Sequence, residues 1–545
     1  MKQGLQYLQM FLLIICFAGG TTWAAYGQSA ENNGNKGEQQ TAHLISSTAD
    51  HSQFKALHKN FKNGPEVTKA CLSCHNKAGK QIQKNIHWTW TYHNKKTGQL
   101  LGKEHLINNF CSNARGNEGM CAQCHISYGA KNFHLPKKQS QIDCLVCHDT
   151  TGKYYRLPPT KGSPACSILF AGKKPIDWKN VAQHVGLPGR ANCGSCHFYG
   201  GGGDNVKHGD LSSIMANPPK SVDVHMSPDG QNFACTACHV TKNHQWSGSR
   251  YQLLAKDTKG VGKPGFRRIA TSCESCHGLN PHPNDSIKHI ALNTHVKRVA
   301  CQSCHIPAFA RGGVATRTFW DWRTAGRTKN GKGFMEDNYV QGNGEKRETY
   351  WSIKGNFKNG ENVVPYYAWF NGQTTYTTVN THFDPTKPVD INHLEGSAND
   401  SASRIWPFKR METWLQYDKG YNNLVYTHLW GNDDESFWGN FKLKPAIARG
   451  MKDAGLPFSG QVGFIKTYSY WPTTHMVAPK KKALACMACH TGGGRLNGIN
   501  GIYMAGHSRF AWLDQIAWIL IALTSAAILI HMLMRMFINF RRRQS

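Results

Sequence analysis

Eight copies of the pattern Cys-x-x-Cys-His constrain this chain of 545 residues more than any other feature. Seven stand between residues 71 and 305, and the eighth stands alone near the C-terminus. Two thiols at positions i and i+3 suit the two vinyl groups of one porphyrin, and the adjacent His suits an axial bond to its iron. The attachment cysteines are Cys71 and Cys74, Cys121 and Cys124, Cys144 and Cys147, Cys193 and Cys196, Cys235 and Cys238, Cys273 and Cys276, Cys301 and Cys304, and Cys486 and Cys489.

A Cys-x-x-Cys pair alone would also fit zinc or a disulfide. Here all eight pairs are followed directly by His, a regularity that neither alternative requires. We therefore expect eight covalently attached haems c, each with one iron ligand from its own motif. These proximal ligands are His75, His125, His148, His197, His239, His277, His305 and His490.

The motifs follow one another too closely for each haem to have its own hydrophobic core. We predict a multihaem cytochrome c, built mainly of short α-helices and loops around a haem stack, with a β-containing insertion and a C-terminal transmembrane helix. The 54 Gly and 22 Pro fit such a loop-rich chain. Residues 58–310 form the predicted seven-haem body, and residues 481–510 form the eighth-haem segment.

The N-terminal residues have the features of a secretory signal. Lys2 precedes an apolar stretch from Met10 to Ala18 and a small-residue region from Thr22 to Ala25. The apolar stretch is too short to span a bilayer. We predict a signal peptide at residues 1–25 and a flexible polar leader at residues 26–57. Export agrees with haem attachment, which takes place outside the cytoplasm.

A second apolar segment runs from Trp512 to Met534, and Arg535 and Arg541 to Arg543 follow it. Its length suffices for a membrane-spanning helix, and the basic flank favours a cytoplasmic end. We predict a transmembrane helix at residues 511–535 and a cytoplasmic basic tail at residues 536–545, with the haem body on the periplasmic side of the inner membrane. A buried globular helix is the alternative. His531 inside the segment would hold a haem b only if a partner supplied the second ligand.

No cysteine occurs between His305 and Cys486. This region is rich in Tyr, Trp, Val and Thr, and it contains Asn-Gly pairs at residues 343–344, 359–360 and 371–372, which are typical of hairpin turns. We predict a β-containing insertion at residues 311–480. Its role is either a lid over the haems or a docking face.

The chain is strongly basic, with 64 Lys and Arg against 33 Asp and Glu. Eight haems bring two propionates each, and these groups need Lys and Arg nearby. Any remaining excess draws small anions toward a cleft. Because no nucleic-acid recognition motif accompanies the charge, we expect no nucleic acid among the partners.

Most of the 28 His lie outside the motifs. A haem with a second His on the opposite face is six-coordinate and suits electron transfer rather than chemistry. A His that lies 6 to 13 residues before a motif cannot readily reach the haem just after it, but it can reach a neighbouring haem. We predict distal ligands among His87, His134, His184, His225, His244, His295 and His475; the alternative for each is a surface position or a propionate contact.

The glycine run after the fourth motif is the clearest candidate for chemistry. Gly200 to Gly203 allow the backbone to approach a cofactor closely, and Asp204, Lys207, His208 and Asp210 follow within a few residues. From the residues alone, Lys207 is a solvated lysine.

Several stretches outside the motifs resemble the octahaem tetrathionate reductase family of c-type cytochromes. They are NIHWTW at His87, NNFC at Cys111, DCLVCHDTTG from Asp143, CGSCHFYGGGGDNVKHGD from Cys193, and FWDW from Phe319. The resemblance covers most of the chain between about His58 and Cys489. The C-terminal apolar segment is a departure from the family, whose best-known form resembles a soluble periplasmic protein.

The resemblance implies an active site at the second haem, with a lysine as distal ligand, an aspartate three residues before it and a cysteine nearby. Lys207, Asp204 and Cys111 match these positions, and His208 is a candidate proton donor. Asp204 either orients the lysine and relays protons or forms a simple salt bridge. Cys111 is either a pocket thiol or the disulfide partner of Cys166.

We therefore expect an oxidoreductase that reduces small sulfur or nitrogen oxyanions, namely the tetrathionate, nitrite and hydroxylamine that the resemblance implies. The other haems relay electrons from an inner-membrane quinol-oxidising partner or cytochrome b, or from periplasmic electron carriers. Two alternatives remain open. One is a non-catalytic conduit between the quinol pool and soluble cytochromes, and the other is the oxidation of hydroxylamine or hydrazine.

Overall fold

The structure, a computed structural model, describes residues 49–108, 110–121, 124–128, 135–156, 175–251, 253–262, 268, 270–431, 433–502, 504 and 511–544. The predicted signal peptide, His134 and Cys166 lie outside these residues. The chain divides into two compact units. One comprises residues 40–488 and 498–502, and the other includes residues 489–497 and the C-terminal segment from residue 503.

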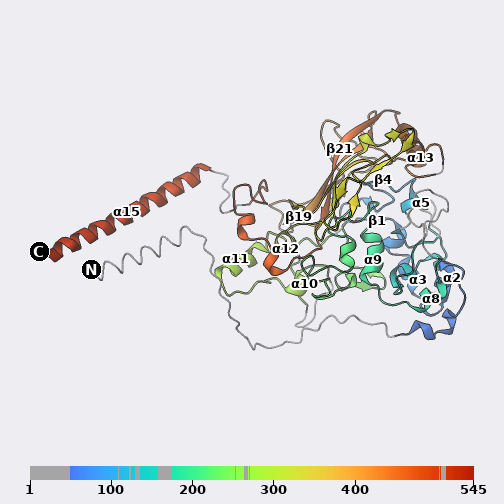
Figure 1. Cartoon of the computed structure of the whole chain (residues 1–545), viewed down its shortest axis with the longest axis horizontal. Coiled ribbons are helices and arrows are strands. Elements are labelled where there is room, and N and C mark those ends of the chain that lie inside the picture. The colour runs from blue at the N-terminus through green and yellow to red at the C-terminus, as the bar shows by residue number, and fades with distance from the viewer. Residues whose placement is uncertain are drawn as a thin grey trace. The chain divides into compact units, whose positions relative to one another are not determined.

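Short helices carry the haem motifs, as predicted (Figure 1). The first of them begins with the Asn63 side chain, which accepts a hydrogen bond from the backbone N–H of Glu66 at 3.1 Å, a typical N-cap. The motif-bearing elements are α2 (Gly64–Cys74), α5 (Glu118–Cys121), α6 (Leu145–His148), α9 (Arg190–His197), η6 (Cys235–Ala237), α10 (Glu274–His277), α12 (Cys301–His305) and η9 (Cys486–Ala488).

The remaining helices of the larger unit are also short. Those of α type are α3 (Ala78–Ile82), α4 (Ile86–Thr89), α8 (Trp178–Gln183), α11 (Ile287–His295), α13 (Phe437–Asn440) and α14 (Leu443–Asp453). The 3-10 turns are η1 (His51–Gln53), η2 (Lys55–Leu57), η4 (Gln139–Gln141), η5 (Ser213–Ala216), η7 (Trp322–Thr324) and η8 (Lys480–Lys482). Because η1 and η2 are ordered and Leu57 is buried, the flexible leader predicted to extend to residue 57 ends earlier than predicted.

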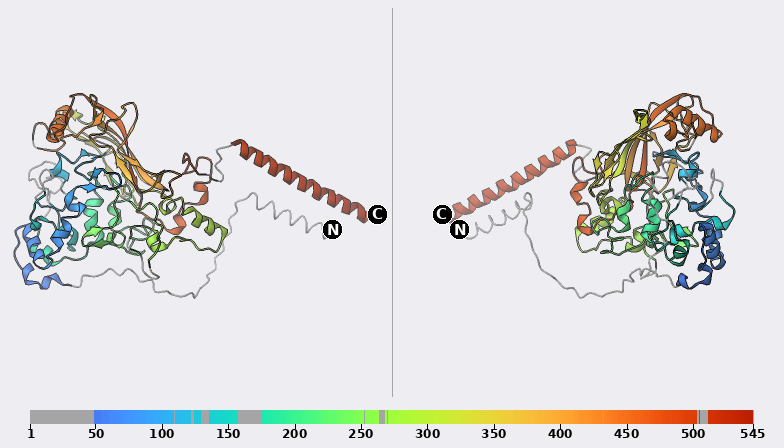
Figure 2. Two further views of the ribbon diagram at one scale, coloured as in Figure 1. Left: turned by 180° about the vertical axis from the view of Figure 1, so that it is seen from behind. Right: turned by 45° about the vertical axis from the view of Figure 1, so that its right-hand side comes forward.

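A nine-stranded sheet lies inside the region predicted to contain β-structure. Its strands follow the order β10 (Met335–Glu336), β13 (Tyr350–Trp351), β14 (Gly355–Gly360), β7 (Thr316–Asp321), β19 (Arg404–Asp418), β21 (Val462–Pro472) and β17 (Val389–Asp390), and β15 (Tyr366–Phe370) and β20 (Asn423–Leu424) also pair with β19. In both views of Figure 2 the long strands lie on one side of this unit and the motif-bearing helices on another.

The alternation of buried and partly exposed residues explains how β21 packs in the sheet. Every second residue from Gly463 to Trp471 is buried, which is the period-two pattern of a strand with one face in the core. Ile465 and Trp471 join a hydrophobic cluster with Met411 of β19 and with Ile447 of α14. The sheet is continuous with the haem region, because the backbone N–H of Ala300, next to the seventh motif, donates to the Ile405 carbonyl of β19 at 3.0 Å.

Only one of the three Asn-Gly pairs lies in a hairpin. Residues 343–344 lie in the loop between β11 (Tyr339–Val340) and β12 (Lys346–Arg347), which pair antiparallel. Residues 359–360 lie within β14, and residues 371–372 connect β15 to β16 (Thr374–Tyr376), which pairs with β18 (Asn392–Leu394) instead. Both of these hairpin predictions were wrong, since long-range pairing overrides the local turn preference. The other small hairpins are β1 (Tyr92–His93) with β2 (Leu100–Leu101), β3 (Ile107–Asn108) with β4 (Ser112–Asn113), β5 (Thr241–Lys242) with β6 (Gln245–Trp246), and β8 (Thr328–Lys329) with β9 (Lys332–Gly333).

The C-terminal unit contains one unbroken helix, α15 (Ala511–Gln544). Its segment Trp512–Arg542, with a mean hydropathy of 2.3 over its most apolar part, is long and apolar enough to cross a membrane. The helix continues through the basic residues predicted as a separate tail, because Met536, Phe537 and Ile538 extend its apolar pattern past Arg535.

Candidate functional site

Five motif histidines each face a second imidazole. The two ring centres of each pair lie 6.1 to 6.4 Å apart. The pairs are His75 with His51, His197 with His87, His239 with His475, His277 with His225, and His305 with His282.

This separation fits an iron between the two rings. Two imidazoles bound to one metal from opposite sides, with metal–nitrogen bonds of about 2 Å, hold their ring centres roughly 6 Å apart. A zinc arrangement is not seen: within the described ranges, no group of three or more His, Cys, Asp or Glu side chains is gathered so that it could hold a metal ion. The residues present therefore fit c-type haem, with cysteines for attachment and imidazoles for the iron.

Thiols of different motifs also meet. Side-chain contacts between thiols join the first motif to the third, the second to the fourth, the fourth to the fifth, and the sixth to the seventh. The contacting residues are Cys71 and Cys144, Cys124 and Cys196, Cys193 and Cys235, and Cys273 and Cys301. Because a porphyrin lies beside its own thiols, these contacts place neighbouring haem sites against one another.

The second motif differs from those five. The ring of His125 stacks on Trp90 with centres 3.3 Å apart, and its buried Nδ1 has no hydrogen-bond partner among the described residues. In the part of the chain that the structure describes, no second imidazole lies in ring contact with His125. The side chain that approaches this motif from the glycine run is Lys207, whose amine interacts electrostatically with the thiol of Cys124.

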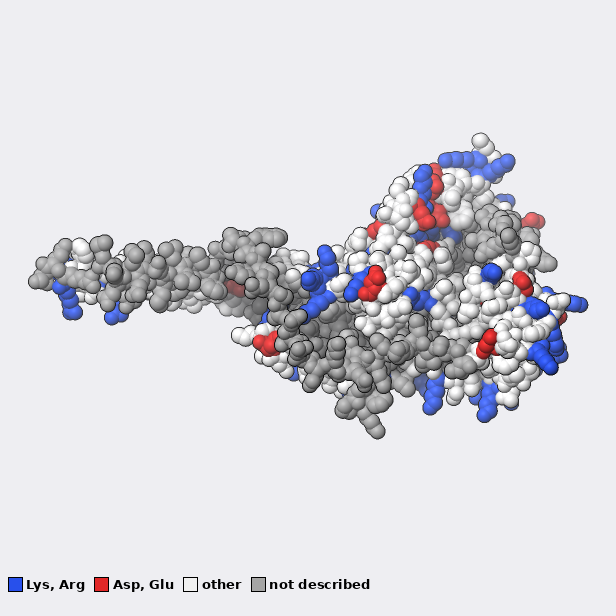
Figure 3. All heavy atoms as spheres, turned by 60° about the horizontal axis from the view of Figure 1, so that its bottom comes forward, with Lys and Arg blue, Asp and Glu red and all other residues white. Residues whose placement is uncertain are grey.

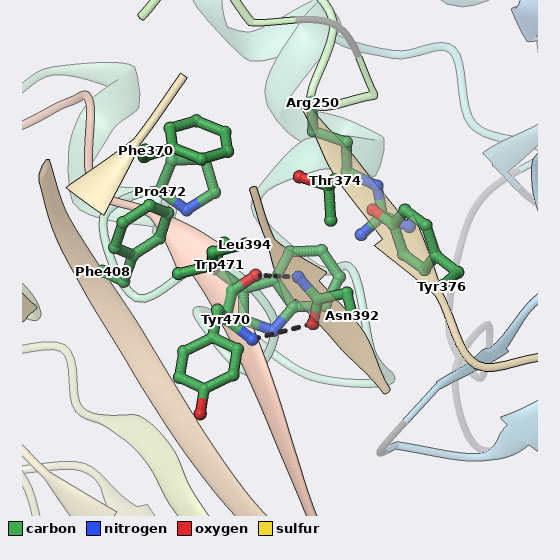
Figure 4. Close-up of a pocket in the computed structure, with 10 residues that line it drawn as sticks. All are labelled: Arg250, Phe370, Thr374, Tyr376, Asn392, Leu394, Phe408, Tyr470, Trp471 and Pro472. Carbon is green, nitrogen blue, oxygen red and sulfur yellow. Dashed lines mark hydrogen bonds between the residues drawn. The ribbon is translucent and has the colours of Figure 1, made fainter. Parts of the chain in front are cut away.

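Trp471 of β21 lies between the basic groups of this region. The amine of Lys207 lies 5.0 Å from the Trp471 ring centre, and the guanidinium carbon of Arg250 lies 4.4 Å from it. The Nε1 of Trp471 is buried, and no hydrogen-bond partner for it occurs among the described residues. Arg250, Trp471 and Tyr376 also line a small cavity of about 10 Å³, with the hydrogen bonds between Asn392 and Tyr470 at its wall (Figure 4).

The electrostatics of this region are dominated by positive charge. Burial lowers the pKa of Lys207 well below its usual value, and Arg250 and Lys103 lower it further. Although burial opposes it, the pKa of Arg250 is raised by Tyr251, to whose hydroxyl Arg250 donates at 3.2 Å. The thiols of Cys124 and Cys121 raise the pKa of Lys103, although burial lowers it. Once these thiols are thioethers they carry no negative charge and no longer raise the pKa. Within the described residues, none of the three basic groups is paired with an Asp or Glu.

Local packing explains the position of Lys207. Gly200 lies under its side chain, since a Cβ there would come within 3.2 Å of the Lys207 Cδ. Gly201 has a φ of +85°, which favours glycine, and a Cβ there would crowd Phe110. Lys409 of β19 donates to the carbonyls of Val206 at 2.6 Å and Lys207 at 3.2 Å, so the sheet holds the backbone of this segment.

The structure places the other predicted site residues at different distances from Lys207. His208 meets Trp471 edge-on with ring centres 5.5 Å apart, and burial followed by Lys207 lowers the pKa of His208 well below its usual value. Asp204 points to Ser213, whose backbone N–H and hydroxyl both donate to its carboxylate, and no contact with the Lys207 side chain is seen among the described residues. The predicted relay role of Asp204 is thus not supported by its geometry; its contacts suit shaping of the loop.

Cys111 lies in a third environment and forms no disulfide with another described cysteine. It packs against the hydrophobic cluster of the sheet and interacts with Cys121 of the second motif. Burial raises the pKa of its thiol, while Lys354 and Arg317 lower it. Its predicted alternative partner, Cys166, lies outside the described residues, so the disulfide stays a prediction.

Of the predicted distal histidines, three belong to the pairs above: His87, His225 and His475. His225 and His475 face the sixth and fifth motifs rather than those that follow them in sequence, as their spacing predicts. His244 interacts with His148 of the third motif, and its Nδ1 contacts Gln81 at 2.8 Å. His184 and His295 contact the carbonyls of Asn180 and Ala291 through Nδ1 and are in none of the five pairs.

Sequence reasoning missed His51, His282, Arg250, Lys103 and Trp471. His282 follows the sixth motif by five residues and stood as close to a motif as many predicted ligands, so spacing alone was able to suggest it. His51 was assigned to the leader. Arg250, Lys103 and Trp471 carry no local signal, because only the fold brings them to the second motif.

Known proteins match this chain over most of its length. A family model described as "Cytochrome c bacterial" matches residues 317–493, and one described as a doubled CXXCH motif matches residues 114–153. An uncharacterised protein of Archaeoglobus fulgidus is 21% identical over 306 residues, covering 47% of this chain and 97% of that protein. The crystal structure of an octahaem cytochrome c from Shewanella oneidensis is 36% identical, with a TM-score of 0.70, and covers 84% of this chain and 100% of that one.

Proposed function

The chain belongs to the octahaem tetrathionate reductase family of c-type cytochromes, and we propose that it carries eight covalently attached haems c and reduces small sulfur or nitrogen oxyanions beside Lys207. The proposed substrates are the anions tetrathionate and nitrite and the neutral molecule hydroxylamine. When bound, the haem attached at Cys121 and Cys124 supplies electrons and an iron coordination position.

Lys207 is the proposed distal ligand of that haem, and it is a ligand that substrate displaces. An ammonium must lose its proton before it binds a metal, and burial among other cations favours the neutral amine. Once displaced, the amine takes up a proton in the presence of an anion and stabilises it. Lys207 therefore serves both as a removable cap and as a substrate contact.

Arg250, Lys103 and Trp471 are the proposed substrate contacts. Arg250 stacks on Trp471, and this cation–π contact contributes about 0.5 to 2 kcal/mol while leaving guanidinium N–H groups for an oxyanion. The buried Nε1 of Trp471 supplies one further donor. His208, whose ring meets Trp471 edge-on, is the proposed proton donor, which reduction of an oxyanion requires.

The single observation that carries the proposal is the group of three half-buried basic side chains, Lys207, Arg250 and Lys103, which pair with no carboxylate among the described residues. Withdrawing unpaired cations from water costs free energy, so such a group in a folded protein calls for an anion. Elsewhere in this basic chain, haem propionates would pair with such charges. The face shown in Figure 3 also has more Lys and Arg than Asp and Glu. Because Lys207 lies next to the second motif, we propose that the anion at this site is a substrate.

The other sites are proposed as relays. The five imidazole pairs are assigned as the axial ligands of their haems, and His244 is assigned to His148 on the basis of their electrostatic contact. His134, His184 and His295 stay candidates for the remaining positions. The thiol contacts then give a route from the fifth site through the fourth to the second.

The same five pairs favour a second candidate function, an electron conduit with no substrate of its own. In that case all haems are low-spin and inert to small ligands. The two functions differ in the response of one haem to an added anion.

Electron paramagnetic resonance of the full-length protein, with and without nitrite or cyanide, tests the proposal. We expect one haem signal to respond in the natural protein. Lys207→Ala should turn one low-spin signal high-spin without added ligand and reduce turnover about 100-fold or more. Lys358→Ala is the matched control, since the Lys358 amine also lies over a ring, 5.2 Å from the Phe319 centre.

Two results would contradict the reductase. One is a natural protein in which no signal responds to either anion, which leaves the conduit. The other is a Lys207→Ala protein whose spectrum and turnover match those of the Lys358→Ala control.

We further propose that α15 anchors the protein to the inner membrane, with the haem body on the periplasmic side. Electrons then come from a quinol-oxidising membrane partner, a cytochrome b or periplasmic carriers. The apolar composition of α15 supports this anchoring.

A further inference from the structure

The histidine opposite the fifth motif has a carboxylate on its outer nitrogen. Nδ1 of His475 lies 3.1 Å from Oδ2 of Asp210, so it is Nε2 of His475 that is left for the side facing His239. The same Oδ2 accepts the backbone N–H groups of Thr474 at 2.7 Å and His475 at 2.9 Å. Asp210 is thus fixed by three contacts to one short segment.

Two of the other distal histidines, His87 and His282, have neutral acceptors at this position. Nδ1 of His87 contacts the side-chain oxygen of Asn85 at 2.8 Å, and Nδ1 of His282 contacts that of Asn293 at 3.2 Å. On the motif side, Nδ1 of His239 contacts the Ser247 carbonyl at 3.0 Å. An amide or carbonyl oxygen accepts the imidazole proton without bringing a full negative charge.

Asp210 is deeply buried. Its side chain is 1% exposed, and its second oxygen, Oδ1, has no hydrogen-bond partner among the described residues. A neighbouring cation is the amine of Lys409, which donates hydrogen bonds to the Val206 carbonyl and the Thr316 hydroxyl. In such surroundings the carboxylate acts on His475 at short range and with little screening.

We propose that Asp210 is a positioning residue that gives His475 anionic character and so lowers the reduction potential of the haem attached at Cys235 and Cys238. A carboxylate that accepts the outer N–H of a ligating histidine fixes its orientation and makes it a stronger donor. A stronger donor and a nearby negative charge both favour the oxidised iron, which carries the extra positive charge.

The place of the fifth haem site in the proposed relay gives its lower reduction potential a role in electron transfer. Thiol contacts join the fifth motif to the fourth and the fourth to the second. A low reduction potential at the fifth site favours transfer of its electron toward the site beside Lys207, so the electron does not remain at the fifth site. Asp210 and Lys207 also lie three residues apart in one loop, so a single segment shapes both the substrate site and its electron supply.

The inference rests on the proposed His239 and His475 pair but not on the identity of the substrate. Redox titration of the full-length protein in the absence of substrate, followed by electron paramagnetic resonance, measures the potential of each haem. Asp210→Asn keeps the size and one acceptor oxygen but removes the charge, and we expect one haem potential to shift in the positive direction.

Asp223→Asn is the matched control. Asp223 is also a buried carboxylate, and it accepts the backbone N–H groups of His225 at 2.9 Å, Met226 at 2.8 Å and Val477 at 3.1 Å. It acts electrostatically on His225 and His475, but among the described residues it makes no hydrogen bond with a histidine Nδ1. Its loss costs the same kind of backbone contact. We expect every haem potential in Asp223→Asn to move less than the one that moves in Asp210→Asn.

A converse variant keeps the proposal testable if Asp210→Asn fails to fold. Asn85→Asp places a carboxylate on Nδ1 of His87, and the haem attached at Cys193 and Cys196 should shift in the negative direction. Unchanged potentials in folded Asp210→Asn, or an equal shift in Asp223→Asn, would overturn the inference. Failure of the substrate site, by contrast, appears as unchanged turnover in Lys207→Ala and leaves these potentials unaffected.

Discussion

The second and fifth motifs have the same attachment sequence and opposite surroundings. His239 of the fifth faces the imidazole of His475 at 6.4 Å and has a carbonyl on its outer nitrogen. His125 of the second stacks on Trp90, has no partner on its buried Nδ1 among the described residues, and lies in a region with Lys207 and Lys103. The motif therefore determines where a haem is attached, while distant segments determine which side chains surround its histidine.

The strongest way to break this contrast is to make the second site resemble the fifth. Lys207→His offers an imidazole where the amine lies, and we expect a haem that no longer responds to cyanide. Turnover should fall about 100-fold or more, because the iron is then capped by a ligand that does not leave. Cyanide titration by optical and paramagnetic resonance spectroscopy checks this, and a variant that still binds cyanide and turns over would remove Lys207 from the site.

A change at Arg250 removes the proposed anion contact while Lys207 stays in place, and so tests the substrate side of the comparison. Arg250→Ala should raise the KM for the anion about 10- to 100-fold with a smaller change in kcat, since a charge-assisted hydrogen bond contributes about 1.5 to 3 kcal/mol. Steady-state kinetics with nitrite and tetrathionate measure it. Arg298→Ala is the control, because the Arg298 guanidinium also stacks on a tryptophan, 4.5 Å from the Trp369 ring centre. Equal effects of the two variants would make Arg250 structural.

Opening a relay site tests whether an exposed iron is sufficient. His282→Ala removes the imidazole that faces His305, and the groups that surround His305 are the imidazoles of His282, His277 and His225 rather than Lys or Arg. We expect a second cyanide-responsive haem and a decrease in turnover smaller than that of Arg250→Ala. An increase in nitrite or tetrathionate turnover would show that the basic side chains around the second motif are dispensable.

Truncation before α15 should have the smallest effect on either kind of site. A chain ending at residue 510 should leave the membrane fraction, because α15 is apolar over most of its length. Turnover with a soluble artificial electron donor should remain unchanged. Sedimentation and activity of the two forms check this, and a truncated chain that still sediments with membranes would require another anchor.

The sequence allowed the haem attachment sites to be predicted because covalent attachment needs a fixed local spacing. It also indicated the short motif helices, the β-containing region and the apolar helix, each of which is encoded within a few dozen neighbouring residues. The position of Lys207 near the second motif came from family resemblance and not from its neighbours in sequence, which suggested a solvated lysine.

Features that depend on distant pairing were not accessible. The Asn-Gly pairs at 359–360 and 371–372 form no hairpin, because their strands pair with segments far along the chain. Arg250 meets Trp471 only because the loop before it folds against β21. Asp204 matched a family position, yet its carboxylate is turned toward Ser213, a neighbour nine residues away that spacing gave no reason to choose.

The length of α15 has a consequence for how electrons reach the protein. With 34 residues it extends about 50 Å, well beyond the roughly 30 Å of a bilayer's hydrocarbon layer. Anchored by α15 as we propose, the protein would search for its donor in two dimensions, where local concentrations are far above those in free solution. Its docking face can then be small and weakly binding, and release after each encounter stays fast.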